Sequence, residues 1–271
     1  MEIIEIIKDA LVFPSENVGT LLIFVVLSIL ATAFSTIGVL VYALGVVNAE
    51  FFLWGGLAAV IAMVIGWVMS GYLISVIKSG IELDDEVPEF EWWENFTTGF
   101  NNFIVSIVYF VIPAFIVVVV GYLTNVFGNI MLVATEIASQ TQNVYLGAST
   151  SIAADAIAQA FVNLAVSLAV TLTVAFILFV IFSFLQTMAE ARLANTGSLG
   201  EALNVFEAAK DIKRIGVGKV ISVILLIIIV AGVIHVIFSI LPILSILSIV
   251  VTPYLLLFTQ RAVGLLYSDI A

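Results

Sequence analysis

The chain has no cysteine, one histidine and only eight lysines and arginines among its 271 residues. The absence of cysteine excludes disulfide bonds, a thiolate nucleophile and thiolate metal ligands. Charged residues make up 10% of the chain and hydrophobic residues 63%. Soluble domains contain about 25% charged residues. A soluble protein of this length needs more polar surface than this chain offers, so the composition indicates a membrane protein.

Six hydrophobic stretches are long enough to cross a bilayer, for which a helix needs about 20 apolar residues. They cover roughly residues 18–47, 52–77, 103–125, 156–188, 217–239 and 244–267. The first stretch is too long for the core of a signal peptide, so we expect it to be retained. The sequence therefore predicts an all-α integral membrane protein with six transmembrane helices, forming a single polytopic domain over residues 1–271.

The basic residues predict the orientation of the chain. All eight lie before the first span, between the second and third, between the fourth and fifth, or at the end of the sixth: Lys8, Lys78, Arg192, Lys210, Lys213, Arg214, Lys219 and Arg261. Loops rich in lysine and arginine are cytoplasmic in most membrane proteins. We therefore expect a plasma-membrane protein with cytoplasmic N- and C-termini. The net charge of −11 argues against a nucleic-acid partner.

An acidic, aromatic segment separates the second and third spans, and it reads ELDDEVPEFEWWENF from Glu82. Its aromatic residues recur at helical spacing, which predicts an amphipathic helix in the membrane interface over about 89–101. Similar amphipathic segments precede the first and fifth spans, at about 2–12 and 199–213, and the capping-box spacing of Ser198 and Glu201 marks the start of the second. The pattern predicts three units, each an interfacial helix followed by a transmembrane hairpin. They cover approximately residues 1–80, 81–196 and 197–271.

Three segments of the chain resemble a known family. They read IKDALVFPSEN, GYLISVIKSGIELDDEVPEFEWWENFTTGF and ARLANTGSLGEALNVFEAAKDIKRIGVGKVI. The family they resemble is an uncharacterised, mainly archaeal group of multi-pass membrane proteins, catalogued as domain of unknown function 4013. The resemblance runs over most of the chain and is most specific in DDEVPEFEWWENF. It implies a membrane location and this architecture, and it supplies no catalytic residue.

Polar residues recur every four positions along the fourth span, as a stripe that drifts around the helix. The stripe consists of Asp155, Gln159, Asn163, Ser167 and Thr171. Polar groups inside a bilayer are costly, so they should face protein or water. The stripe therefore either bonds neighbouring helices together or lines a polar pathway, and we expect the first.

A cluster of basic residues precedes and opens the fifth span, where anionic lipid headgroups would be met. It consists of Lys210, Lys213, Arg214 and Lys219. The alternative is that these residues only set the topology of the chain. His235 lies within the fifth span, where an ionisable residue is either functional or a neutral imidazole bonded to another helix.

No pattern of catalytic or metal-binding residues is evident. The carboxylates of Glu82–Glu94 lack the glycine-turned ligand spacing of a dedicated calcium loop. We expect no catalytic residue, no metal and no cofactor. The leading functional hypothesis is a non-enzymatic scaffold or lipid-interacting membrane protein. A transporter or channel for a small solute or lipid is the alternative, and a membrane-interface enzyme is the second alternative. Membrane lipid is the expected partner, and a protein partner or a homo-oligomer stays open.

Overall fold

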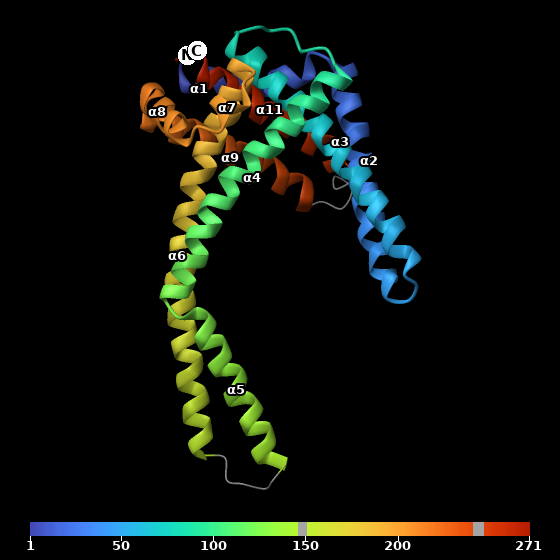
Figure 1. The fold of residues 1–271 in the computed structure, drawn as a ribbon. Helices are drawn as coiled ribbons and strands as arrows, with labels where there is room; N and C mark the ends of the chain where they lie inside the picture. The colour runs from blue at the N-terminus through green and yellow to red at the C-terminus, as the bar shows by residue number, and fades with distance from the viewer. Residues whose placement is uncertain (146–150, 241–246) are drawn as a thin grey trace. The chain divides into compact units, whose positions relative to one another are not determined.

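A computed structural model describes the backbone of residues 1–145, 151–240 and 247–271, and these residues form helices joined by short connections (Figure 1). The elements are α1 (Ile3–Val12), η1 (Phe13–Ser15), α2 (Val18–Ala43), η2 (Leu44–Val46), α3 (Glu50–Ile81), α4 (Trp92–Leu123), α5 (Val126–Tyr145), α6 (Ser151–Thr196), α7 (Leu199–Ala202), α8 (Val205–Ile215), α9 (Val217–Ile240) and α11 (Ser248–Tyr267). The prediction of an all-α protein is confirmed.

Six helical segments in the described part of the chain are long and apolar enough to cross a membrane, which confirms the six-helix membrane class. They are Val18–Val46, Glu50–Ile81, Trp92–Leu123, Asp155–Thr196, Val217–Phe238 and Ser248–Tyr267. The last has the lowest mean hydropathy, 1.6, and the largest share of buried side chains. The start predicted for this span, residue 244, lies outside the described residues.

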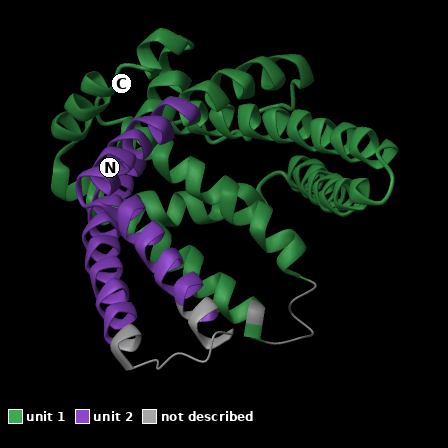
Figure 2. Ribbon diagram, turned by 60° about the horizontal axis from the view of Figure 1, so that its bottom comes forward, with its two compact units in different colours: residues 1–106, 185–271 green, residues 107–184 purple. Residues whose placement is uncertain are grey.

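The chain forms two compact units, which Figure 2 shows in different colours. Unit 1 comprises residues 1–106 and 185–271, and unit 2 comprises residues 107–184. The long helices α4 and α6 each contribute to both units, and α5 belongs to unit 2. The boundaries predicted near residues 80 and 196 do not coincide with those of the compact units. The single domain made of three segments stays a prediction.

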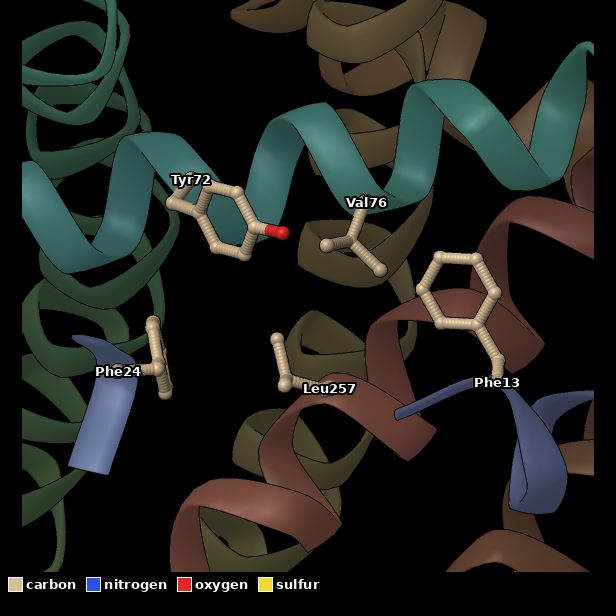
Figure 3. Packing of buried hydrophobic residues seen from close by; sticks show 5 residues of the cluster. All are labelled: Phe13, Phe24, Tyr72, Val76 and Leu257. Carbon is tan, nitrogen blue, oxygen red and sulfur yellow. The ribbon is translucent and has the colours of Figure 1, made fainter. Parts of the chain in front are cut away.

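A hydrophobic cluster joins α2, α3 and α11 to the connection after α1 in unit 1. It consists of Phe13, Phe24, Tyr72, Val76 and Leu257, each at most 2% exposed (Figure 3). The ring centroids of Phe24 and Tyr72 are 5.9 Å apart. The Tyr72 hydroxyl donates a hydrogen bond of 3.1 Å to the Pro88 carbonyl, which attaches the acidic segment after α3 to this cluster.

Glycines bring α3 into backbone contact with two of its neighbours in unit 1. A Cβ on Gly71 would collide with the carbonyl oxygen of Asn95 in α4, and a Cβ on Gly99 would collide with that of Trp67 in α3. A Cβ on Gly264 would collide with the backbone of α3 where α11 crosses it. Small residues allow this close approach of membrane helices.

The separate interfacial helix predicted over about 89–101 is wrong. Residues 87–91 form no helix, and α4 continues without a break from Trp92 to Leu123. Gly99 does not end the helix because it packs directly against α3. Asn102 lies further along α4, and its Nδ2 donates a 2.9 Å hydrogen bond to Ser70 Oγ of α3. The amphipathic stretch from Trp92 onward and the third span therefore form one continuous helix.

Separate short helices do precede the first and fifth spans. α1 begins with a capping box formed by Glu2 and Glu5, and the Ser198 side chain caps α7 as the spacing of Ser198 and Glu201 predicted. Gly216 separates α8 from α9 because its φ of 104° is a conformation that favours glycine. The placement of these two helices in the membrane interface stays a prediction. The three-unit arrangement is not confirmed, because the middle unit has no separate helix before its span.

The structure has a further helix between the third and fourth predicted spans. α5 covers Val126–Tyr145, and Asn125 makes the turn before it with a φ of 58°, which asparagine tolerates. The apolar part of α5, Val126–Ser139, is shorter than the spans. A search for runs of about 20 apolar residues therefore misses this helix.

Candidate functional site

Arg261 of α11 is 1% exposed and joins separate segments of unit 1. Its Nε donates to Asp9 Oδ1 at 3.0 Å, and its Nη2 donates to Asp85 Oδ1 at 3.4 Å. Its Nη1 donates to the carbonyl oxygen of Asp84, and the guanidinium carbon lies 4.4 Å from the ring centroid of Phe13. Because a buried charge must be paired and hydrogen-bonded, these contacts give Arg261 a structural role.

Arg192, near the end of α6, forms a second buried ion-pair cluster in unit 1. It donates to Asp211 Oδ2 at 2.7 Å and to Glu201 Oε2 at 2.5 Å. Asp211 of α8 is 0% exposed, and it also accepts hydrogen bonds from the Tyr267 hydroxyl at 2.9 Å and from Arg214 Nη1 at 3.1 Å. These contacts compensate the buried carboxylate and fix α8 to α6 and α11.

The two ends of the chain meet in unit 1, and Figure 1 shows the N and C labels side by side. The N-terminal ammonium lies 3.2 Å from Asp269 Oδ1, and Lys219 Nζ donates to Asp269 Oδ2 and, at 2.8 Å, to the carbonyl of Met1. Burial opposes the ionisation of Asp269. The hydrogen bonds from Lys219 and the N-terminus nevertheless hold its pKa below the ordinary value of 3.8.

The exposed side of α8 carries one aromatic and three basic side chains. Phe206, Lys210, Lys213 and Arg214 have helical spacing, which places them on one face. Phe206 is 81% exposed, and the side chains of Lys210 and Arg214 are 59% and 58% exposed. The hydrogen bond from Lys210 at 2.5 Å lowers the pKa of Glu207. We call these four side chains the outer face of α8.

The four cations predicted to meet lipid headgroups occupy two places. Three belong to the outer face of α8, whereas Lys219 lies in α9 and pairs with Asp269. Lys213 is exposed and forms no ion pair with the described residues. Headgroup binding by these residues stays a prediction.

One half of the polar stripe on α6 packs against other helices of unit 2. Ser167 is 5% exposed and Thr171 is 8% exposed. Asn129 Nδ2 of α5 donates to Ser167 Oγ at 3.1 Å, and the hydroxyl oxygens of Thr171 and Thr124 are 2.9 Å apart. These hydrogen bonds connect α6 to α5 and to the turn between α4 and α5 within that unit.

The other half of the stripe is exposed. Gln159 Nε2 donates to Asn163 Oδ1 at 3.0 Å within α6, and the Asn163 backbone carbonyl accepts a 3.3 Å hydrogen bond from Asn129. Asp155 is exposed one turn before Gln159. The choice between helix packing and a polar pathway stays a prediction for these three side chains.

His235 is exposed on α9. Among the residues whose placement is described, no three histidine, aspartate or glutamate side chains lie close enough together to hold a metal ion. The expectation that the protein needs no metal stays a prediction, as does the absence of a catalytic residue.

Sequence reasoning missed the buried charged groups. Arg192 and Arg261 were used only as markers of topology, and Asp211 was not singled out, although each of the three is at most 8% exposed. For the two arginines, the sequence did offer a signal: each lies near the end of a long apolar stretch, where a charged side chain needs a partner.

Gln186 and Glu190 form a further polar contact in α6, one helical turn apart. Gln186 Nε2 donates to Glu190 Oε1 at 3.1 Å.

Comparison with known families gives one match, described as "Protein of unknown function (DUF4013)", over residues 54–243. The matched range begins in α3 and includes the acidic segment, Arg192 and α8. Comparison with curated proteins and with solved structures found no match.

Proposed function

The chain belongs to the DUF4013 family, and we propose that this integral membrane protein is a non-enzymatic scaffold that binds anionic lipid headgroups through the outer face of α8. The construction of α8 carries the proposal. Its inner side is fixed by Asp211, which accepts hydrogen bonds from Arg192 and Tyr267. Its outer side presents an exposed Phe206 beside three cations.

The charge balance on α8 favours an anionic surface. Asp211 is buried and pairs with Arg192 inside unit 1 and with Arg214 on the outer face. Glu207 is the remaining carboxylate of α8, against Lys210, Lys213 and Arg214. A lysine or arginine near an anionic bilayer surface contributes about 1 kcal/mol of binding free energy. An exposed aromatic ring beside such cations suits the level of the headgroups.

The buried ion pairs support a scaffold more than an enzyme. Arg192 and Arg261 are each engaged by carboxylates from more than one segment, so they act as connectors between helices. The contact between Met1 and Asp269 agrees with an even number of spans. We further propose that the protein lies in the plasma membrane with both termini in the cytoplasm, because all eight lysines and arginines belong to unit 1.

Lipid enrichment tests the proposal. The whole protein is placed in nanodiscs of mixed neutral and anionic phospholipid, and the co-isolated lipids are counted by native mass spectrometry. We expect the variant Lys210→Gln/Lys213→Gln/Arg214→Gln to lose at least about tenfold in affinity for anionic lipid, since each cation contributes about 1 kcal/mol. Lys8→Gln, an exposed cation on α1, is the control for general loss of charge. Unchanged enrichment in a folded triple variant would overturn the proposal.

A transporter or channel is the second candidate, and the exposed part of the α6 stripe favours it. Asp155, Gln159 and Asn163 are exposed on a helix long enough to span a membrane. Such groups need water or protein around them. Because the chain has no cysteine, a single Asn163→Cys substitution, at an exposed position of the stripe, can be labelled selectively. Reaction with a membrane-impermeant thiol reagent in a folded preparation would support a pathway, and failure to react would favour the scaffold.

A further inference from the structure

A hollow lies in unit 1 between the end of α3 and the start of α4. Its volume is about 270 Å³. Six carboxylate side chains line it: Glu82, Asp84, Glu86, Glu89, Glu91 and Glu94. Drug-sized ligands occupy pockets of about 300–1,000 Å³, so this hollow has the size for a smaller molecule. We call it the acidic hollow.

Asn95 also lines the acidic hollow, although it is only 1% exposed. Its Nδ2 atom is buried and has no hydrogen-bond partner. Its Oδ1 atom lies 3.5 Å from Ser75 Oγ, which is itself 3.4 Å from the Gly71 carbonyl. A buried polar atom without a partner is costly, so water or a bound group is needed to complete its hydrogen bonding.

The amide of Asn95 can be oriented in two ways, and both leave one atom unpaired. When its nitrogen and oxygen are exchanged, the Ser75 hydroxyl donates to the Gly71 carbonyl and accepts from Nδ2. The unpaired atom is then Oδ1, an acceptor. The backbone of Asn95 is held by its direct contact with Gly71, so in this exchanged orientation the acceptor is in place before any ligand binds.

The charge around the hollow is strongly negative. Lys78 is the only basic side chain among its lining residues, against six carboxylates. A hydrogen bond with Glu94 and repulsion from the same carboxylate raise the pKa of Glu91. An acidic excess of this kind attracts cations.

We propose that the acidic hollow binds a small organic cation with two or more ammonium groups. An ammonium group carries three N–H donors and no acceptor, which suits carboxylates and the oxygen of Asn95. Val87 and Pro88 line the same hollow and offer an apolar contact for the carbon chain between the ammonium groups. Within the described residues, no three carboxylates come together as a metal site, so the carboxylates suit a long cation better than a single ion.

Calorimetry with spermidine tests the proposal on the whole protein in nanodiscs of neutral lipid, where the lipid itself does not attract the probe. We expect one saturable site. We also expect at least tenfold weaker binding of n-butylamine, which has a single ammonium group, and of Mg²⁺. No binding of spermidine, or equal binding of Mg²⁺, would overturn the proposal.

Two variants separate this site from general electrostatics. Glu91→Gln/Glu94→Gln removes two exposed carboxylates of the hollow, and we expect spermidine affinity to fall at least tenfold. Glu16→Gln/Glu50→Gln removes two exposed carboxylates elsewhere and should leave the affinity within twofold. Equal losses in both variants would overturn the proposal. Asn95→Ala should also weaken binding, and unaltered affinity in a folded Asn95→Ala protein would contradict the role of the amide.

Discussion

The guanidinium of Arg261, near the end of the chain, lies 3.0 Å from the carboxylate of Asp9, near its beginning. The arginine side chain is 1% exposed and the aspartate side chain is 32% exposed. Helices α1 and α11 are thereby held together in unit 1, and the same guanidinium reaches Asp85 in the acidic segment after α3. Arg261 is therefore a connector of three parts of the chain that are distant in sequence.

Arg261→Gln should destabilise the protein strongly. Removing one partner of a buried ion pair costs about 3–5 kcal/mol, because the remaining polar groups lose their compensation. The matched control is Asp85→Asn, whose side chain is 89% exposed. It should cost about 0–1 kcal/mol. Thermal unfolding in detergent measures both, and equal small shifts would contradict the role assigned to Arg261.

Asp211→Asn should release α8 from the rest of unit 1. Its carboxylate accepts from Arg192, Arg214 and the Tyr267 hydroxyl, so the amide leaves Arg192 without its buried counter-ion. Hydrogen exchange over residues 199–215 should accelerate more than exchange over α3. Tyr267→Phe removes one hydrogen bond and should cost only about 1 kcal/mol. A protected α8 in the Asp211→Asn variant would show that other contacts hold this helix.

Gly71→Ala should separate α3 from α4. The added Cβ would collide with the Asn95 carbonyl, and backbone at a helix crossing cannot move aside cheaply. Gly66→Ala in the same helix is the control, because a Cβ there has no atom within 4 Å. We expect a lower unfolding temperature for Gly71→Ala and an unchanged or higher one for Gly66→Ala, since alanine favours helix by about 1 kcal/mol over glycine. Similar effects of the two substitutions would refute the close crossing.

Acid should separate the two chain ends. The pKa of Asp269 is lower in the folded protein than its ordinary value of 3.8, so its contribution to stability is complete above about pH 4. That contribution is lost as the pH falls through the lower, folded pKa. The unfolding temperature of the native protein should therefore drop in this acidic window more than that of Asp269→Asn. If the unfolding temperatures of the two proteins fell equally with pH, the ionisation of Asp269 would not contribute to stability.

The helices could be predicted from the sequence because they depend on local properties. Long apolar runs predicted the six spans, and the capping residues Ser198 and Glu201 predicted the start of α7. The continuity of α4 could not be predicted in this way. The role of Gly99 depends on α3, because its backbone packs against the Trp67 carbonyl of that helix.

The candidate sites were harder to predict because they depend on contacts between distant residues. The sequence places Asp211 on the polar side of an amphipathic helix, and only its three donors show that it is buried. The basic residues of α8 were found from their position before the fifth span. Lys219 differs from these residues because it pairs with Asp269, which is 50 residues away in the sequence and could not be recognised as its partner.

The position of Phe206 relative to the bilayer tests the central claim most directly. Because the chain has no cysteine, a nitroxide on Phe206→Cys reports this position alone, and a nitroxide on Gly200→Cys, at an exposed position of α7, provides a comparison outside α8. In nanodiscs containing anionic lipid, the label at 206 should be relaxed by oxygen dissolved in the lipid, and the label at 200 by a water-soluble nickel complex. A label at 206 that is accessible only to the nickel complex, in a protein whose α8 amides remain protected, would contradict lipid binding by the outer face of α8.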